Sequence, residues 1–231
     1  DFYGQTSISG GTDAFITKFN SSGDEQWTRL LGVDNHSPKL STRSEAVAIG
    51  SDDSIYITGY TQGDLDGETN SGSSGLHTEA FISKFNSDGN KLWTKLFGSP
   101  ISTGGDGIVL GNDSSIYITG STMGDLDGEI NSGSRDVFIS KFNGSGEKQW
   151  TKLLGSSSNE FSHEITSGDD GSIYITGVTS GELDGVYKEV RGINGRVDDD
   201  AFISKFKEIY FPTDISLSTY SFNENLSKES A

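Results

Sequence analysis

Residues 116–142 read IYITGSTMGDLDGEINSGSRDVFISKF, and the rest of the chain is arranged around copies of this stretch. Similar copies occupy residues 55–85 and 173–206, and residues 13–19 match the end of a further copy. The Ile-Tyr-Ile-Thr-Gly motif recurs at intervals of 61 and 57 residues. A repeat of this length holds several strands and packs against its neighbours, so the sequence predicts an array of similar units.

Each unit is predicted to contain four short strands, which in the best-defined copy are residues 45–49, 55–58, 79–85 and 91–97. Turn residues such as Asn86-Ser-Asp-Gly89 separate them, and no stretch shows helical periodicity. Four antiparallel strands per repeat predict an all-β fold made of β-propeller blades, with residues 45–49 innermost. The two classes of long loop are expected on one face, where a rigid scaffold commonly carries function.

The composition excludes several classes of function. The chain has 231 residues, enough for one or two domains, and 31% hydrophobic residues, enough for a lean core. Its formal net charge of −17 opposes binding to nucleic acid or anionic membranes and favours cations. The absence of cysteine excludes thiol chemistry and disulfides. No apolar run reaches the roughly 20 residues that insertion across a bilayer requires.

Two acidic loops are the strongest candidates for a binding site. Their oxygen-bearing side chains stand at alternate positions, a pattern that suits a hard cation such as calcium. The predicted ligands are Asp64, Asp66, Glu68 and Asn70 in the first loop and Asp125, Asp127, Glu129 and Asn131 in the second. Because Val186 and Lys188 replace two of them in the third copy, we expect that copy not to bind.

The alternative for these loops is an ordinary solvated turn. In that interpretation the Asp side chains accept hydrogen bonds from backbone amides, and the leucine of Asp-Leu-Asp-Gly anchors the loop. The loops also depart from an EF-hand, because Gly67 and Gly128 stand at the fourth position of the motif.

Recurring aromatic residues favour packing over ligand binding. Trp27, Trp93 and Trp150 occupy equivalent positions, one in each repeat. Exposed indoles can stack on sugars, but one aromatic residue at a fixed strand position is typical of contact between neighbouring units. We therefore expect these tryptophans to lie between adjacent blades.

Signatures of catalysis are scarce. His36, His77 and His163 lack the spacing of metal ligands, and no nucleophile elbow or phosphate-binding loop is present. The sequence therefore predicts a protein that is not an enzyme. A glycan hydrolase or lyase with its site on the long loops is the alternative, since propellers also host such enzymes.

The motifs Ile-Tyr-Ile-Thr-Gly, Leu-Asp-Gly, Asp-Ala-Phe-Ile-Ser-Lys-Phe and Trp-Thr-Lys-Leu-Leu-Gly together resemble the bacterial SBBP β-propeller repeat over residues 13–206. The strand order is similar to that of NHL-type propellers. The resemblance implies a partial or open propeller from a large secreted or cell-surface protein, without catalytic residues. Residues 1–12 are then the loop remnant of a truncated blade, and upstream propeller blades of the same parent chain are expected partners.

The end of the chain carries a second resemblance. Residues 212–226, PTDISLSTYSFNENL, are similar to the opening of cadherin-like repeats, in which an early glutamate, matched by Glu224, binds interdomain calcium. The last repeat ends at Phe206 without a tryptophan strand, so we expect an intact ring to supply its fourth strand from elsewhere. Residues 207–231 are accordingly interpreted as a linker and the first strand of a cadherin-like domain.

These features together predict a non-catalytic extracellular module. We expect it to mediate adhesion or to bind a polysaccharide or protein ligand, with calcium as a stabilising ion. The alternatives are the glycan-active enzyme and a purely structural spacer.

Overall fold

The computed structural model describes residues 4–8, 10–33, 40–72, 77–183, 199–208 and 215–221. Within these ranges the chain is all-β and contains no helix, and so no helix that could cross a membrane. The strands are β1 (Ala14–Phe19), β2 (Glu25–Leu31), β3 (Thr42–Ile49), β4 (Ile55–Thr61), β5 (Glu79–Phe85), β6 (Lys91–Phe97), β7 (Thr103–Leu110), β8 (Ile116–Thr122), β9 (Asp136–Phe142), β10 (Lys148–Leu154), β11 (Glu160–Ser167), β12 (Ile173–Thr179), β13 (Asp200–Glu208) and β14 (Ile215–Ser221).

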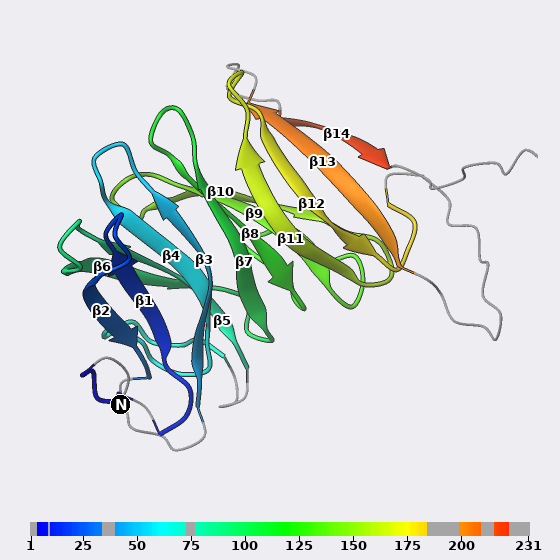
Figure 1. The fold of residues 1–231 in the computed structure, drawn as a ribbon. Helices are drawn as coiled ribbons and strands as arrows, with labels where there is room; N and C mark the ends of the chain where they lie inside the picture. The colour runs from blue at the N-terminus through cyan, green and yellow to red at the C-terminus, as the bar shows by residue number, and fades with distance from the viewer. Residues whose placement is uncertain are drawn as a thin grey trace, which may run out of the picture.

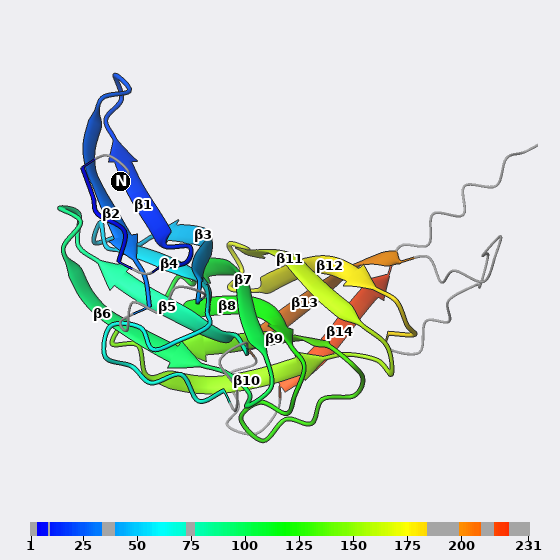
Figure 2. The same ribbon diagram turned by 90° about the horizontal axis from the view of Figure 1, so that it is seen from below.

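Consecutive strands form three antiparallel sheets of four strands each. These are β3–β6, β7–β10 and β11–β14, and each pairs its strands in sequence order, while β1 and β2 form a two-stranded hairpin. The first strands adjoin, since β7 contacts both β3 and β11 (Figure 1). Viewed from below, the hairpin and the three sheets follow one another along an arc (Figure 2). The predicted division of each repeat into four strands agrees with this arrangement.

The hydrophobic core lies between successive sheets. Side chains alternate along a strand, so each sheet can present one apolar face to the sheet before it and another to the sheet after it. Between the sheets β3–β6 and β7–β10, the ring of Phe97 on β6 lies 5.8 Å from that of Phe138 and 5.0 Å from that of Phe142, both on β9. The repeats are therefore held together by packing between their faces.

The tryptophans lie between neighbouring units, as predicted. The indole of Trp27 packs on Gly89 in the β5–β6 turn, and that of Trp93 packs on Gly146 in the β9–β10 turn. Both glycines have positive φ, 75° and 81°, and a Cβ on Gly89 would lie only 2.7 Å from the Trp27 ring. Turn geometry and close approach thus both require glycine at these positions.

The third sheet contains a fourth strand from the end of this chain. Strand β14 pairs antiparallel with β13, with Phe202 opposite Ser221 and Glu208 opposite Ile215. This differs from the expectation that the fourth strand comes from elsewhere, while the interpretation of residues 207–231 as a linker and the first strand of a cadherin-like domain stays a prediction. Pairing with β14 covers an edge of β13 that would otherwise present unpaired backbone groups.

The loops from second to third strands and the loops between sheets meet on one face, as predicted. The backbone NH of Thr103 donates to the carbonyl of Thr78 at 2.9 Å, and that of Glu160 donates to the carbonyl of Arg135 at 2.8 Å. Each bond joins the end of a loop within one sheet to the start of the next sheet. We call this side of the molecule the long-loop face.

Candidate functional site

The two acidic loops of the long-loop face fold as tight turns. In the second loop, the backbones of Leu126 and Glu129 exchange two hydrogen bonds of 3.0 Å, and Asp127 and Gly128 turn the corner with φ of 56° and 88°. Two successive positive φ values favour an Asp-Gly pair. Leu126 is buried and anchors the turn. The first loop has the same geometry at residues 65–68.

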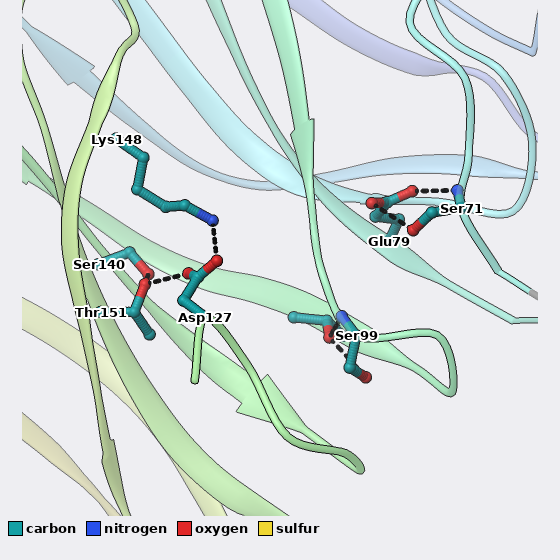
Figure 3. Close-up of polar contacts among 8 residues, drawn as sticks. Ser71, Glu79, Ser99, Asp127, Ser140, Lys148 and Thr151 are labelled. Carbon is teal, nitrogen blue, oxygen red and sulfur yellow. Dashed lines mark hydrogen bonds and ion pairs between the residues drawn. The ribbon is translucent and has the colours of Figure 1, made fainter. Parts of the chain in front are cut away.

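Charged side chains of the neighbouring β10 strand hold the outer carboxylates of the second loop. Asp127 accepts hydrogen bonds from Lys148 and from the Thr151 hydroxyl, the latter at 2.5 Å (Figure 3). Glu129 accepts a hydrogen bond of 2.7 Å from Lys152. All three donors, Lys148, Thr151 and Lys152, therefore come from one strand, β10.

The inner side chains of the loop bond to its own backbone. Asp125 Oδ1 accepts from the backbone NH of Asn131 at 2.9 Å. The Asn131 amide donates to the carbonyl of Thr122 at 3.1 Å and accepts from the NH of Gly133 at 3.1 Å. The first loop repeats the whole set, with Asp64 bonded to Asn70, Asp66 to Lys91 and Thr94, Glu68 to Lys95, and Asn70 to Thr61 and Gly72.

All predicted calcium ligands of the two loops therefore have protein partners. The described part of the chain contains no group of three or more His, Cys, Asp or Glu side chains arranged to hold a metal. The contacts match the turn alternative, and calcium binding by these loops stays a prediction. Glu224 and most of the third loop, from residue 184 to residue 198, lie outside the described residues, as does His36.

Sequence reasoning missed a row of bulge residues on the first strands of the three sheets. At each bulge, one residue of the first strand has no partner residue on the second strand. These extra residues are Glu45 on β3, Asp106 on β7 and His163 on β11. A bulge redirects a side chain out of the regular alternation. We call these three residues the axial row. They occupy one position of the repeat but differ in chemistry, so no motif marked them.

Asp106, at the centre of the axial row, is electrostatically unusual. Burial raises the pKa of its carboxyl to about 6, and the negative charge of Glu45 adds to the rise. A hydrogen bond of 2.8 Å from the Ser162 hydroxyl opposes it, as do the charges of His163 and Arg135. Near neutral pH this carboxyl is therefore closer to half-protonation than an ordinary aspartic acid.

An arginine and an aromatic ring lie beside the axial row on the long-loop face. The guanidinium carbon of Arg135 lies 5.1 Å from the ring centroid of Phe161, which is itself exposed. Arg135 also donates to the Ser121 hydroxyl at 3.4 Å. Carboxylates, a cation and an exposed ring thus share one surface, a combination that can bind hydroxyl groups and an apolar ring face together.

Buried acidic side chains on the same face accept hydrogen bonds from residues of the long loops. Asp136 is fully buried, and its Oδ2 accepts a hydrogen bond of 2.7 Å from the backbone NH of Ser132. Burial raises the pKa of Asp136, and the charge of Glu160, also buried, adds to the rise. Glu79 holds Ser71 in the equivalent way through its NH and hydroxyl (Figure 3). These carboxylates fix loop conformation and face away from solvent.

Part of this chain is similar in sequence to a known bacterial protein. No protein-family model matches the chain. Over 93 residues it is 36% identical to the regulatory protein FlaEY of Caulobacter vibrioides, and the aligned region covers 38% of this chain and 9% of that relative. The chain therefore spans less than a tenth of the length of that relative, and the similarity concerns one segment of a much longer protein.

Proposed function

We propose that this chain is a run of β-propeller blades that forms a non-catalytic, extracellular surface for adhesion to a polysaccharide or protein ligand. The observation that carries the proposal is the position of the axial row, where acidic side chains lie beside Arg135 and Phe161 on the long-loop face. Residues from all three sheets contribute to this surface, so its geometry depends on the whole array.

The repetition of the sheets supports the assignment as blades. Three antiparallel sheets of the same strand order follow one another with their first strands adjoining. In a propeller, four-stranded blades surround a central channel. On this assignment the first strands β3, β7 and β11 border the channel, and the axial row lines its wall near one end.

The chemistry of the surface favours a ligand rich in hydroxyl groups and without strong negative charge. Glu45 and Asp106 can accept hydrogen bonds from sugar hydroxyls, and the ring of Phe161 can cover an apolar sugar face. The net charge of −17 opposes an acidic polysaccharide or a nucleic acid. We therefore place neutral glycans first among the ligands.

Screening of the chain against immobilised neutral and acidic glycans tests the proposal. We expect binding to neutral glycans that weakens about 10-fold in Phe161→Ala, because the stacking surface is lost. Leu92→Ala is the matched control, since Leu92 is also an exposed apolar residue but lies on β6, the fourth strand of its sheet. If no glycan binds, or if Phe161→Ala and Leu92→Ala bind equally well, the glycan-binding surface is wrong.

A glycan-active enzyme is the second candidate, and the raised pKa of Asp106 is the observation that favours it. A carboxyl that is partly protonated near neutral pH can act as a general acid at a glycosidic oxygen. Product analysis separates the two functions. An enzyme should release product from the bound glycan and lose about 100-fold or more of its rate in Asp106→Asn, whereas a binding module should release none.

A further inference from the structure

The β1–β2 hairpin is the second half of the repeated sheet. Residues 13–19, DAFITKF, match residues 136–142, DVFISKF, at the third strand. The pairing of β1 with β2 also copies that of β5 with β6, including the irregularity after Lys18 and after Lys84. In the complete sheets, β4, β8 and β12 lie on the other side of the third strand, whereas β1 belongs to a two-stranded sheet.

Apolar side chains that are buried in the complete sheets are exposed around β1. Phe19 is 51% exposed, whereas the equivalent Phe85 is 1% exposed. On β3, Val47 is 58% exposed, whereas the equivalent Ile108 on β7 is 7% exposed. Figure 1 shows β1 beside β3. Between them lies a hollow of about 510 Å³, lined by Ile16, Phe19, Trp27, Val47 and Ile49, among other residues.

The next interface along the arc shows what covers such a surface. There Ile108 and Leu110 of β7 pack in one cluster with Ala46, Ala48 and Tyr56 of the preceding sheet. The first strand of one sheet thus contributes small side chains, and its second strand contributes a tyrosine. Together they cover the apolar side chains on the first strand of the next sheet. By continuity with this interface, Val47 and Ile49 require the same kind of cover.

A recurring contact indicates that such a cover includes a tyrosine. The amine of Lys84 lies 5.0 Å from the ring centroid of Tyr56, and the amine of Lys141 lies 5.4 Å from that of Tyr117. In each pair the lysine is on the third strand and the tyrosine is opposite it on the second. Lys18 holds the equivalent position on β1 and donates to the carbonyl of Ser87 instead, at 2.9 Å.

We propose that the edge of β1 opposite β2 and the face of β3 that carries Val47 and Ile49 form a docking site for a β-hairpin of this repeat type. Its first strand carries alternate alanines over Val47 and Ile49, and its second strand, Ile-Tyr-Ile-Thr-Gly, pairs antiparallel with β1. The register of the complete sheets places the tyrosine opposite Lys18 and the glycine opposite Phe15. This inference rests on the repetition of the sheets and is independent of the glycan-binding surface.

The test adds a hairpin of this repeat type and measures what it covers. The chain is extended by placing a copy of residues 42–78 directly before Asp13, in place of residues 1–12, so that the copy ends where β1 begins. Because the chain contains no cysteine, single variants Ile49→Cys and Ile130→Cys report local exposure through their rate of maleimide labelling. The matched control extension carries Ile55→Asp and Ile57→Asp within the copied segment, which prevents it from packing.

We expect the matched extension to slow labelling at Ile49→Cys by about 10-fold or more, because a docked hairpin must open before the thiol reacts. Labelling at Ile130→Cys should be equal in all chains, since Ile130 lies in a loop away from the hollow. Equal labelling of Ile49→Cys with the matched and control extensions would overturn the proposal.

A second outcome distinguishes another occupant. If Ile49→Cys in the chain without an extension becomes protected as its concentration rises, and light scattering shows a dimer, then a second copy of the chain occupies the surface. That result would also overturn the assignment to a repeat hairpin. Neither measurement depends on whether the long-loop face binds glycans.

Discussion

The acidic loops and the axial row use carboxylates in opposite ways. In the loops, Asp127 accepts hydrogen bonds from Lys148 and from the Thr151 hydroxyl, so a cation and a neutral donor compensate its negative charge. In the axial row, Asp106 has one hydroxyl donor, from Ser162, and a second acid, Glu45, close enough to raise its pKa. The negative charges of the acidic loops are therefore better compensated than that of Asp106 in the axial row.

The difference teaches that acidic motifs by themselves are a poor guide to a site in a chain of this charge. The Asp-Leu-Asp-Gly motif is conspicuous because it recurs, and it recurs in the structure as a turn that closes around a buried leucine. The axial row is inconspicuous because its members differ in residue type. It nevertheless combines a carboxyl of raised pKa, that of Asp106, with an exposed surface. Four predictions test this contrast.

The largest effect is expected at the leucine that anchors a loop. Leu126→Ala should lower the free energy of unfolding by about 2–4 kcal/mol, because it empties a fully buried position between the turn and the core. Urea denaturation measures the change. Ile130→Ala in the same loop is the control and should cost under about 0.5 kcal/mol, since its side chain is exposed. Similar costs for both variants would mean that the turn is not anchored by leucine.

A smaller effect of opposite sign is expected at Asp106. Its pKa is raised from 3.8 to about 6 on folding, so the folded state favours the protonated form. The resulting stabilisation is fully present below about pH 4 and is lost as the pH rises to about 6. Asp106→Asn should therefore stabilise the protein by about 1–2 kcal/mol at about pH 7.5 and by much less at about pH 3.5.

Urea denaturation of the wild type and of Asp106→Asn at both pH values checks this prediction. Asp24→Asn is a suitable control, because Asp24 is exposed in the β1–β2 turn and away from the axial row. A stability gain for Asp106→Asn that is the same at both pH values would contradict the assigned titration.

The ion pairs of the loops should contribute less. Asp127→Asn keeps an acceptor for the Thr151 hydroxyl and removes the charge that pairs with Lys148, at a cost of about 0.5 kcal/mol. Asp127→Ala should cost about 1 kcal/mol more, because alanine tolerates the φ of 56° at this corner less well than asparagine does. The difference between the two variants in urea measures the backbone contribution together with the lost hydrogen bond from Thr151, separately from the charge.

The smallest effect is expected from removing divalent cations. Because the predicted ligands already have protein partners, EDTA should change the melting temperature by less than about 1 °C, and calorimetric titration with calcium should give no heat from these loops. A fall in melting temperature with EDTA, abolished in Asp125→Ala with Asp127→Ala, would instead establish the calcium prediction.

Much of the fold was predictable because strand patterns and turns are local. Ile-Tyr-Ile-Thr-Gly and Asp-Val-Phe-Ile-Ser-Lys-Phe mark two strands that pair in every repeat, and their order predicts the four-stranded sheets. The packing of Trp27 and Trp93 followed from their fixed position in the repeat. The pairing of β14 with β13 was missed, because residues 215–221 share no motif with the earlier fourth strands.

The sequence by itself determined the repeat, the all-β class and the leucine-anchored turns, because each depends on residues close together in the chain. Only the tertiary structure decided which lysine pairs with which carboxylate. It also brought Glu45, Asp106 and His163 together in one row. Those relations join residues about 20 to 60 positions apart, brought together by the pairing of strands and the packing of sheets. Charge and burial at such positions are properties of the assembled sheets, and a local pattern does not contain them.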